Sequence, residues 1–141
     1  MFRYLLLVGL ITCAGCTINL PQGASTSVQI PGTVTRTPLL TTGFVVPPRQ
    51  NYSQQFNAPG GGRVKGTFRT DYDIVASVMN QEAFNSLSTG GGRGQLFYVS
   101  GKVSGGEIDV TVPAGTHYLV FHNNYSLLTS KHMSAEIYLE R

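Results

Sequence analysis

Tryptophan is absent from this sequence of 141 residues, cysteine occurs twice, and charged residues make up only 12%. Both cysteines lie in the first sixteen residues, so residues 17–141 cannot form a disulfide among themselves. A domain in this part of the chain must therefore be held together by its hydrophobic core. The net charge of +3 is too small for the strongly basic surface that nucleic-acid-binding domains carry, so we expect no nucleic-acid partner.

The sequence also lacks the motifs of common catalytic and metal sites. It contains neither H-E-x-x-H nor G-x-S-x-G, and no two histidines are four residues apart. The glycine-rich residues 60–67 are not a phosphate-binding loop, because the lysine precedes the last glycine and a strand is expected next. The seven acidic residues are too scattered to nominate a catalytic pair. We therefore expect a protein that is not an enzyme and holds no cofactor or metal.

The first sixteen residues, MFRYLLLVGLITCAGC, are arranged as a secretory signal. Arg3 precedes an apolar run over residues 4–11, and small residues follow that run. The run is too short for a permanent membrane span, which needs about 20 apolar residues. Ala14, Gly15 and Cys16 end the segment in a pattern that resembles the lipobox of bacterial lipoproteins.

The lipobox resemblance implies that residues 1–15 are a cleaved signal peptide and that lipidation of Cys16 anchors the mature chain in a membrane. Thr17 stands where lipoproteins retained in the inner membrane tend to carry aspartate, which implies the outer membrane of a bacterial cell envelope. Two alternatives remain open. One is an uncleaved anchor, and the other is a thiol redox pair, because Cys13 and Cys16 read C-x-x-C. No βαβ pattern follows these cysteines, so we favour the lipobox.

Residues 16–42 are rich in threonine, serine and proline and keep no helical or strand period. We interpret them as the lipidated cysteine followed by a tether, with an added edge strand as the alternative. The folded domain is then expected over residues 43–141.

Short apolar stretches separated by glycine and proline turns predict that this domain is all-β. One helix is expected at residues 81–88, with Asn80 as its N-cap and Gly90 as its end. Seven or eight strands at this spacing favour an antiparallel β-sandwich of jelly-roll type. The strands are expected at residues 43–46, 50–57, 63–69, 74–79, 95–103, 107–112, 116–121 and 133–139, with a tight turn at 104–106.

The last third of the chain contains Pro113, Gly115, Tyr118 and Phe121, then Asn123, Ser126 and Lys131, then a final alternating strand. This order is similar to the end of GOLD (Golgi dynamics) domains. The resemblance implies a β-sandwich that is not catalytic and that mediates protein contacts or lies near lipids. Asn123, Ser126 and Lys131 are then a candidate polar corner, for which we expect a structural role.

Two further groups of residues are candidate sites. Arg63 and Arg93 end two G-G-G-R sequences, and Lys65 lies two residues after the first. We interpret these three residues as a candidate anion-binding edge for lipid phosphate or another envelope polymer, with flexible turns of similar composition as the alternative. His122 and His132 are expected to face each other if Phe121 pairs with Met133. They lack a third metal ligand, so we interpret them as surface histidines.

Asp71 and Asp73 are close enough in sequence to contribute to a Ca²⁺ site, although two carboxylates beside a strand are more typical of a solvated turn.

These observations together predict a lipid-anchored envelope protein whose β-sandwich binds or scaffolds another envelope component, either a protein or a glycan. A carbohydrate-binding module is the first alternative, and a hydrolase of an envelope polymer is the second. The carbohydrate alternative depends on an exposed row among six tyrosines: Tyr52, Tyr72, Tyr98, Tyr118, Tyr125 and Tyr138.

Overall fold

Six strands and one helix make up residues 33–141, the part of the chain that the computed structural model describes. All strand pairs are antiparallel, which confirms the prediction of an all-β domain. The predicted signal peptide and Cys16 lie outside the described residues. In chain order the elements are β1 (Arg36–Val46), β2 (Asn51–Ala58), β3 (Gly62–Asn80), α1 (Gln81–Thr89), β4 (Leu96–Val112), β5 (Gly115–His122) and β6 (Lys131–Glu140).

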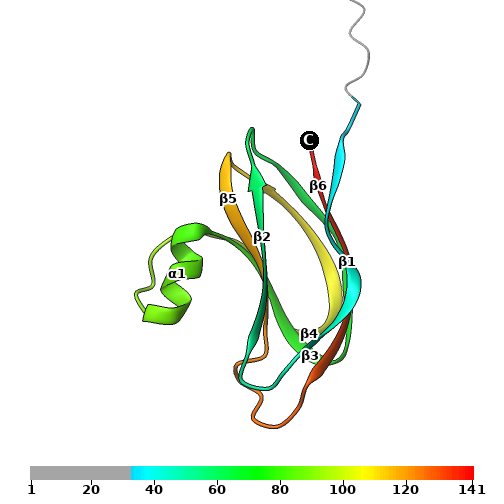
Figure 1. Cartoon of the computed structure of the whole chain (residues 1–141), viewed down its shortest axis with the longest axis vertical. Coiled ribbons are helices and arrows are strands. Elements are labelled where there is room, and N and C mark those ends of the chain that lie inside the picture. The colour runs from blue at the N-terminus through cyan, green and yellow to red at the C-terminus, as the bar shows by residue number, and fades with distance from the viewer. Residues whose placement is uncertain (1–32) are drawn as a thin grey trace, which may run out of the picture. The chain divides into compact units, whose positions relative to one another are not determined.

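The strands form one sheet that curls on itself because β3 changes partners along its length. Its first half pairs with β6, from Arg63 to Thr70, and its second half pairs with β5, from Val75 to Asn80. The register shifts between these halves, and β4 follows β3 on its other side. The sheet order is therefore β1-β6-β3-β5-β2, with β4 beside β3 (Figure 1).

The hydrophobic core lies between the two halves of the curled sheet. Phe121 of β5 packs against Phe44 of β1 and Phe68 of β3, with ring centroids 5.6 Å and 5.5 Å apart. Apolar and exposed residues alternate along β6, as predicted for the last strand. Gly66 allows β3 to approach β6 closely, because a Cβ at this position would lie 2.0 Å from the carbonyl oxygen of Glu136.

The predicted number of strands is wrong, since two pairs of expected strands are each continuous. Residues 63–69 and 74–79 both belong to β3, and residues 95–103 and 107–112 both belong to β4. The predicted turn at 104–106 is part of β4, where Gly105 and Gly106 pair with Arg69 and Phe68. A Cβ at Gly105 would lie 3.0 Å from the carbonyl oxygen of Phe68, so glycine serves close strand approach at this position instead of a turn.

The first strand also begins earlier than expected. The sequence predicted a tether as far as residue 42, whereas β1 begins at Arg36 and pairs with β6 from that residue onward. Leu40 is buried opposite Ile137 in this stretch. For residues 36–42, the added edge strand is therefore the correct alternative.

Helix α1 closes the β3–β4 hairpin and confirms the predicted helix and its caps. The Asn80 side chain accepts a hydrogen bond from the Ala83 N–H at 2.9 Å, and Gly90 ends the helix with φ of 69°. Phe84 stacks on Tyr118 with ring centroids 3.9 Å apart, so the helix covers the outer side of β5. In the described residues, no helix is long and apolar enough to cross a membrane.

The domain has two ends of different construction. At the terminal end, Thr35 and Arg141 exchange backbone hydrogen bonds of 2.8 Å and 3.0 Å, so the chain enters the domain where it also finishes. The loop end comprises the β1–β2 turn, the β5–β6 loop at residues 123–130 and residues 71–73 of β3. These three residues lie between the two paired halves of β3, where its pairing is interrupted, and we call them the β3 bend. β1 runs from one end to the other (Figure 1). Its eleven residues span about 33 Å at about 3.3 Å per residue.

Candidate functional site

The loop end is built around the buried side chain of Asn123, which follows β5 directly. Its amide nitrogen lies 3.0 Å from the carbonyl oxygens of Val46 and Pro47 and 2.9 Å from that of Thr129. The side chain therefore connects the β1–β2 turn to the β5–β6 loop. Asn123 is fully buried, so these bonds are shielded from water.

Backbone hydrogen bonds brace the same loop. The Arg49 N–H lies 3.1 Å from the carbonyl oxygen of Asn123 and 3.0 Å from that of Ser126. Arg49 adopts φ of 60°, a conformation that costs free energy in a residue other than glycine. Ser126 also hydrogen-bonds Thr129 through its hydroxyl group. Asn123 and Ser126 of the predicted polar corner thus both hydrogen-bond the backbone of Thr129 and hold the loop in place.

Lys131, the third residue of the predicted corner, faces a different part of the loop end. Its side-chain nitrogen lies 5.0 Å from the ring centre of Tyr72, in the β3 bend. A second cation–π pair lies nearby, with the Lys102 nitrogen 4.2 Å from the ring centre of Tyr125. The Tyr125 hydroxyl donates a hydrogen bond of 2.6 Å to the backbone oxygen of Asp73, which connects the two pairs. Burial, and secondly the charge of Asp73, raise the pKa of Tyr125 above its ordinary value.

Two adjacent leucines form the tip of this braced loop. Leu127 is 64% exposed and Leu128 is 91% exposed. Sequence reasoning missed them, although an apolar pair inside a polar loop was the available signal. We call Tyr72, Lys102, Tyr125, Leu127, Leu128 and Lys131 the loop-end surface.

The residues predicted as an anion-binding edge are not brought together. Arg63 and Lys65 lie at the start of β3, at the open end of the β3–β4 hairpin, whereas Arg93 lies in the loop after α1 at its closed end. Arg63 forms a two-pronged ion pair with Asp109. The hydrogen bond between them raises the pKa of Arg63 and lowers that of Asp109. Arg63 therefore already has an anionic partner within the domain.

The expected pairing of His122 with His132 is wrong, because β5 and β6 lie in different halves of the sheet. His122 pairs with Asn51 and Val75 on the neighbouring strands, and its ring nitrogen Nε2 lies 2.7 Å from the Ser77 hydroxyl oxygen. Burial lowers the pKa of His122. The residue is thus a neutral, partly buried histidine at neutral pH.

His132 instead binds Asp71 on the outer side of the sheet. Nδ1 of His132 lies 2.8 Å from one carboxylate oxygen, and the other oxygen accepts the His132 backbone N–H at 2.9 Å. Desolvation raises the pKa of Asp71, but the hydrogen bonds from His132 outweigh this effect and leave the pKa below its usual value. In the described part of the chain, no serine, threonine or cysteine is hydrogen-bonded to this imidazole, so the pair lacks a nucleophile.

No group of three potential metal ligands occurs within residues 33–141. Asp71 is occupied by His132, and Asp73 contributes its backbone oxygen to Tyr125, so the geometry does not assemble a Ca²⁺ site from these two residues.

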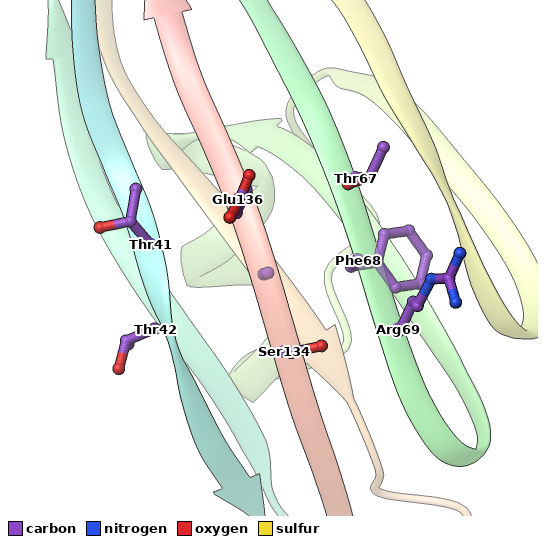
Figure 2. A pocket seen from close by; sticks show the side chains of 8 residues that line it. Thr41, Thr42, Thr67, Phe68, Arg69, Ser134 and Glu136 are labelled. Carbon is purple, nitrogen blue, oxygen red and sulfur yellow. The ribbon is translucent and has the colours of Figure 1, made fainter.

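A shallow cavity of about 250 Å³ lies on the outer side of β1, β6 and β3. Figure 2 shows its side chains on these three neighbouring strands. The polar residues that line it are Thr41, Thr42, Thr67, Arg69, Ser134 and Glu136. They offer hydrogen bonds to a polar ligand, but the cavity contains no histidine that would activate a hydroxyl group as a nucleophile.

The six tyrosines do not form an exposed row. Only Tyr72 among them is exposed, at 54%, while Tyr118 is buried beneath α1 and the other four are partly buried. Tyr52, for example, stacks on Phe44 with ring centroids 4.1 Å apart. The aromatic platform on which the carbohydrate alternative depended is therefore missing.

Neither the comparison with protein-family models nor that with curated proteins finds a match for this chain.

Proposed function

We propose that this chain is a lipid-anchored binding module of the bacterial cell envelope, held in the outer membrane through Cys16, and that the loop-end surface is where it binds. The supporting observation is a pair of exposed leucines on a loop that buried hydrogen bonds hold in place. The module is not catalytic, and its partner is another envelope component.

The exposure of Leu127 and Leu128 has a free-energy cost that supports this assignment. Full burial of a leucine side chain contributes about 1.5–3 kcal/mol, and most of this is forgone at two adjacent positions. Single exposed leucines are ordinary, but adjacent apolar residues at a protruding tip are typical of interaction sites. The bonds of Asn123 fix the loop path, so the tip is presented instead of collapsing onto the core.

The position of the tip also suits an anchored binding module. Thr35 pairs with Arg141 at the terminal end, so the segment that carries Cys16 joins the domain there. The loop end is the opposite end of β1. The loop-end surface is therefore separated by the length of β1 from the end at which the chain enters the domain.

Two measurements on the full-length protein test this function. Metabolic labelling with a fatty-acid analogue should label the natural chain and should not label Cys16→Ala, and membrane fractionation should show the anchor lost in parallel. A photo-crosslinker at position 128 should then capture an envelope component, whereas one at position 87, an exposed leucine on α1, should not. Label that persists in Cys16→Ala refutes the anchor, and equal capture at both positions refutes the loop end as the binding surface.

A further inference from the structure

We propose that the partner of the loop-end surface is an anionic lipid surface, with Leu127 and Leu128 entering the acyl region and the exposed Lys102 contacting lipid phosphates. This proposal rests on the proposed function, because it names the envelope component that the module binds. The shape of the tip, its uncompensated cations and its tyrosines each support a lipid surface.

The apolar part of the surface is a pair of adjacent leucines that protrude from one loop into solvent. Leu128 is 91% exposed and Leu127 is 64% exposed, while Asn123 at the base of the same loop is fully buried. Ser126, Thr129 and Ser130 flank the two leucines. A bilayer accepts such a protrusion without a preformed pocket, whereas a protein partner needs a complementary cavity.

The cations of the loop-end surface have no carboxylate partner. Within residues 33–141, the ion pairs are Arg36–Glu140, Arg63–Asp109 and His132–Asp71, so neither Lys102 nor Lys131 takes part in one. Lys131 is only 6% exposed, and its ammonium group faces the Tyr72 ring. Lys131 therefore contributes its positive charge from within the domain, whereas Lys102 is exposed and can contact an external anion directly.

The nearby acidic residues do not cancel this charge. The Asp71 carboxylate is engaged by His132, and Asp73 is the remaining acid in the bend. Arg49, in the β1–β2 turn, adds a third cation to the loop end. The three cations Arg49, Lys102 and Lys131 exceed the two carboxylates by one, so the loop end carries a small net positive charge next to its apolar tip, and this combination favours anionic lipid.

The tyrosines match the polar layer of a membrane. Tyr72 is 54% exposed beside Lys131, and Tyr125 lies beneath Lys102. Tyrosine combines an apolar ring with a polar hydroxyl group and is enriched where membranes meet water. The loop-end surface thus has an apolar part, formed by the leucine tip, and a polar, cationic part, formed by the tyrosine hydroxyl groups and the lysine nitrogens.

The absence of tryptophan gives a direct test. In the full-length anchored protein, Leu128→Trp introduces a single tryptophan at the tip, and Leu87→Trp introduces one at an exposed leucine of α1 as the matched control. Both are reconstituted into phosphatidylcholine vesicles with and without phosphatidylglycerol. We expect the fluorescence of Leu128→Trp to shift to the blue and to be quenched by brominated acyl chains when phosphatidylglycerol is present. Leu87→Trp should show neither change.

The role of Lys102 is tested in the Leu128→Trp background. Lys102→Gln should weaken the docking equilibrium, read from the quenched fraction, by about fivefold. Lys65→Gln on the outer side of β3 should leave it unchanged.

Tip fluorescence that matches that of Leu87→Trp in both vesicles overturns the lipid proposal, as does crosslinking at position 128 to a protein but not to lipid. The second outcome leaves the proposed function intact, and the fatty-acid labelling of Cys16 is independent of both.

Discussion

The terminal end and the loop end of this domain differ in the surroundings that they give to charged and apolar side chains. At the terminal end, Arg36 and Arg63 each bind a carboxylate, Glu140 and Asp109 respectively. At the loop end, the nitrogens of Lys102 and Lys131 face aromatic rings, and two leucines point into solvent. The arginines of the terminal end have carboxylate partners within the domain. The loop end has cations without a carboxylate partner and exposed leucines, which an external partner would cover.

The difference also extends to the way each end is held. Backbone pairing of β1, β6 and β3 continues to the terminal end, so the sheet itself fixes it. At the loop end the ladders stop at Val46–Lys131 and Asn51–His122, and the loop beyond them is held by the side-chain bonds of Asn123 and by backbone bonds from Arg49. A single substitution should therefore damage the loop end far more than the terminal end.

Asn123→Ala should produce the largest loss of stability, because it acts on the loop end. It removes the donor to the carbonyl oxygens of Val46, Pro47 and Thr129 and leaves buried groups unpaired. We expect a loss of about 2–4 kcal/mol in the free energy of unfolding, measured by urea denaturation of the full-length protein. Asn124→Ala is the matched control, because Asn124 is exposed, and it should change the free energy by no more than about 0.5 kcal/mol. Equal effects at positions 123 and 124 would mean that the loop is held by other contacts.

His122, the last residue of β5, should make the loop end sensitive to pH. Its burial beside Ser77 lowers the pKa in the folded state below the ordinary value of 6.5. The unfolded chain therefore binds a proton first as the pH falls. Stability contributed by the neutral ring should be complete above pH 6.5 and should be lost as the pH falls through the folded-state pKa.

Urea midpoints across this pH range provide the measurement for His122. His122→Gln should flatten the decline, because glutamine does not titrate. His132→Gln is the control, since its imidazole is exposed and paired with Asp71, and it should leave the decline in place. A decline that survives His122→Gln would assign the pH dependence to another group.

The parts of the fold that follow from local sequence were predicted correctly. Asn80 and Gly90 bound α1 because capping depends on residues within one turn. The alternation of β6 likewise identified its buried face, which includes Met133 and Ile137. Both signals are contained within about ten residues, so no knowledge of the topology was needed.

The errors arose where distant segments decide the structure. Gly105 and Gly106 have the composition of a turn, yet they pair with β3, which comes more than thirty residues earlier in the chain. His122 and His132 are separated because β5 and β6 lie in different halves of the curled sheet. Neither the pairing of the two glycines nor the separation of the two histidines can be recognised from a short stretch of sequence.

The candidate site shows the same limit. The sequence selected Asn123, whose amide group hydrogen-bonds three backbone carbonyl oxygens in the structure. It did not select Leu128, because the exposure of this side chain depends on a loop path that Asn123 fixes through Val46, 77 residues away.

Removal of the Arg36–Glu140 ion pair at the terminal end should have the smallest effect on the free energy of unfolding. The Arg36 side chain is 58% exposed, and its nitrogen lies 2.7 Å from a Glu140 oxygen, so solvent and salt screen the attraction. Arg36→Ala should therefore cost only about 0.2–1 kcal/mol in the free energy of unfolding, and added salt should shrink the difference. Arg36→Lys retains the charge, so its free energy of unfolding, measured by urea denaturation, should lie between those of the natural chain and Arg36→Ala. A loss as large as that of Asn123→Ala would show that the terminal end depends on its ion pairs, whereas a small, salt-sensitive loss indicates that backbone pairing holds it.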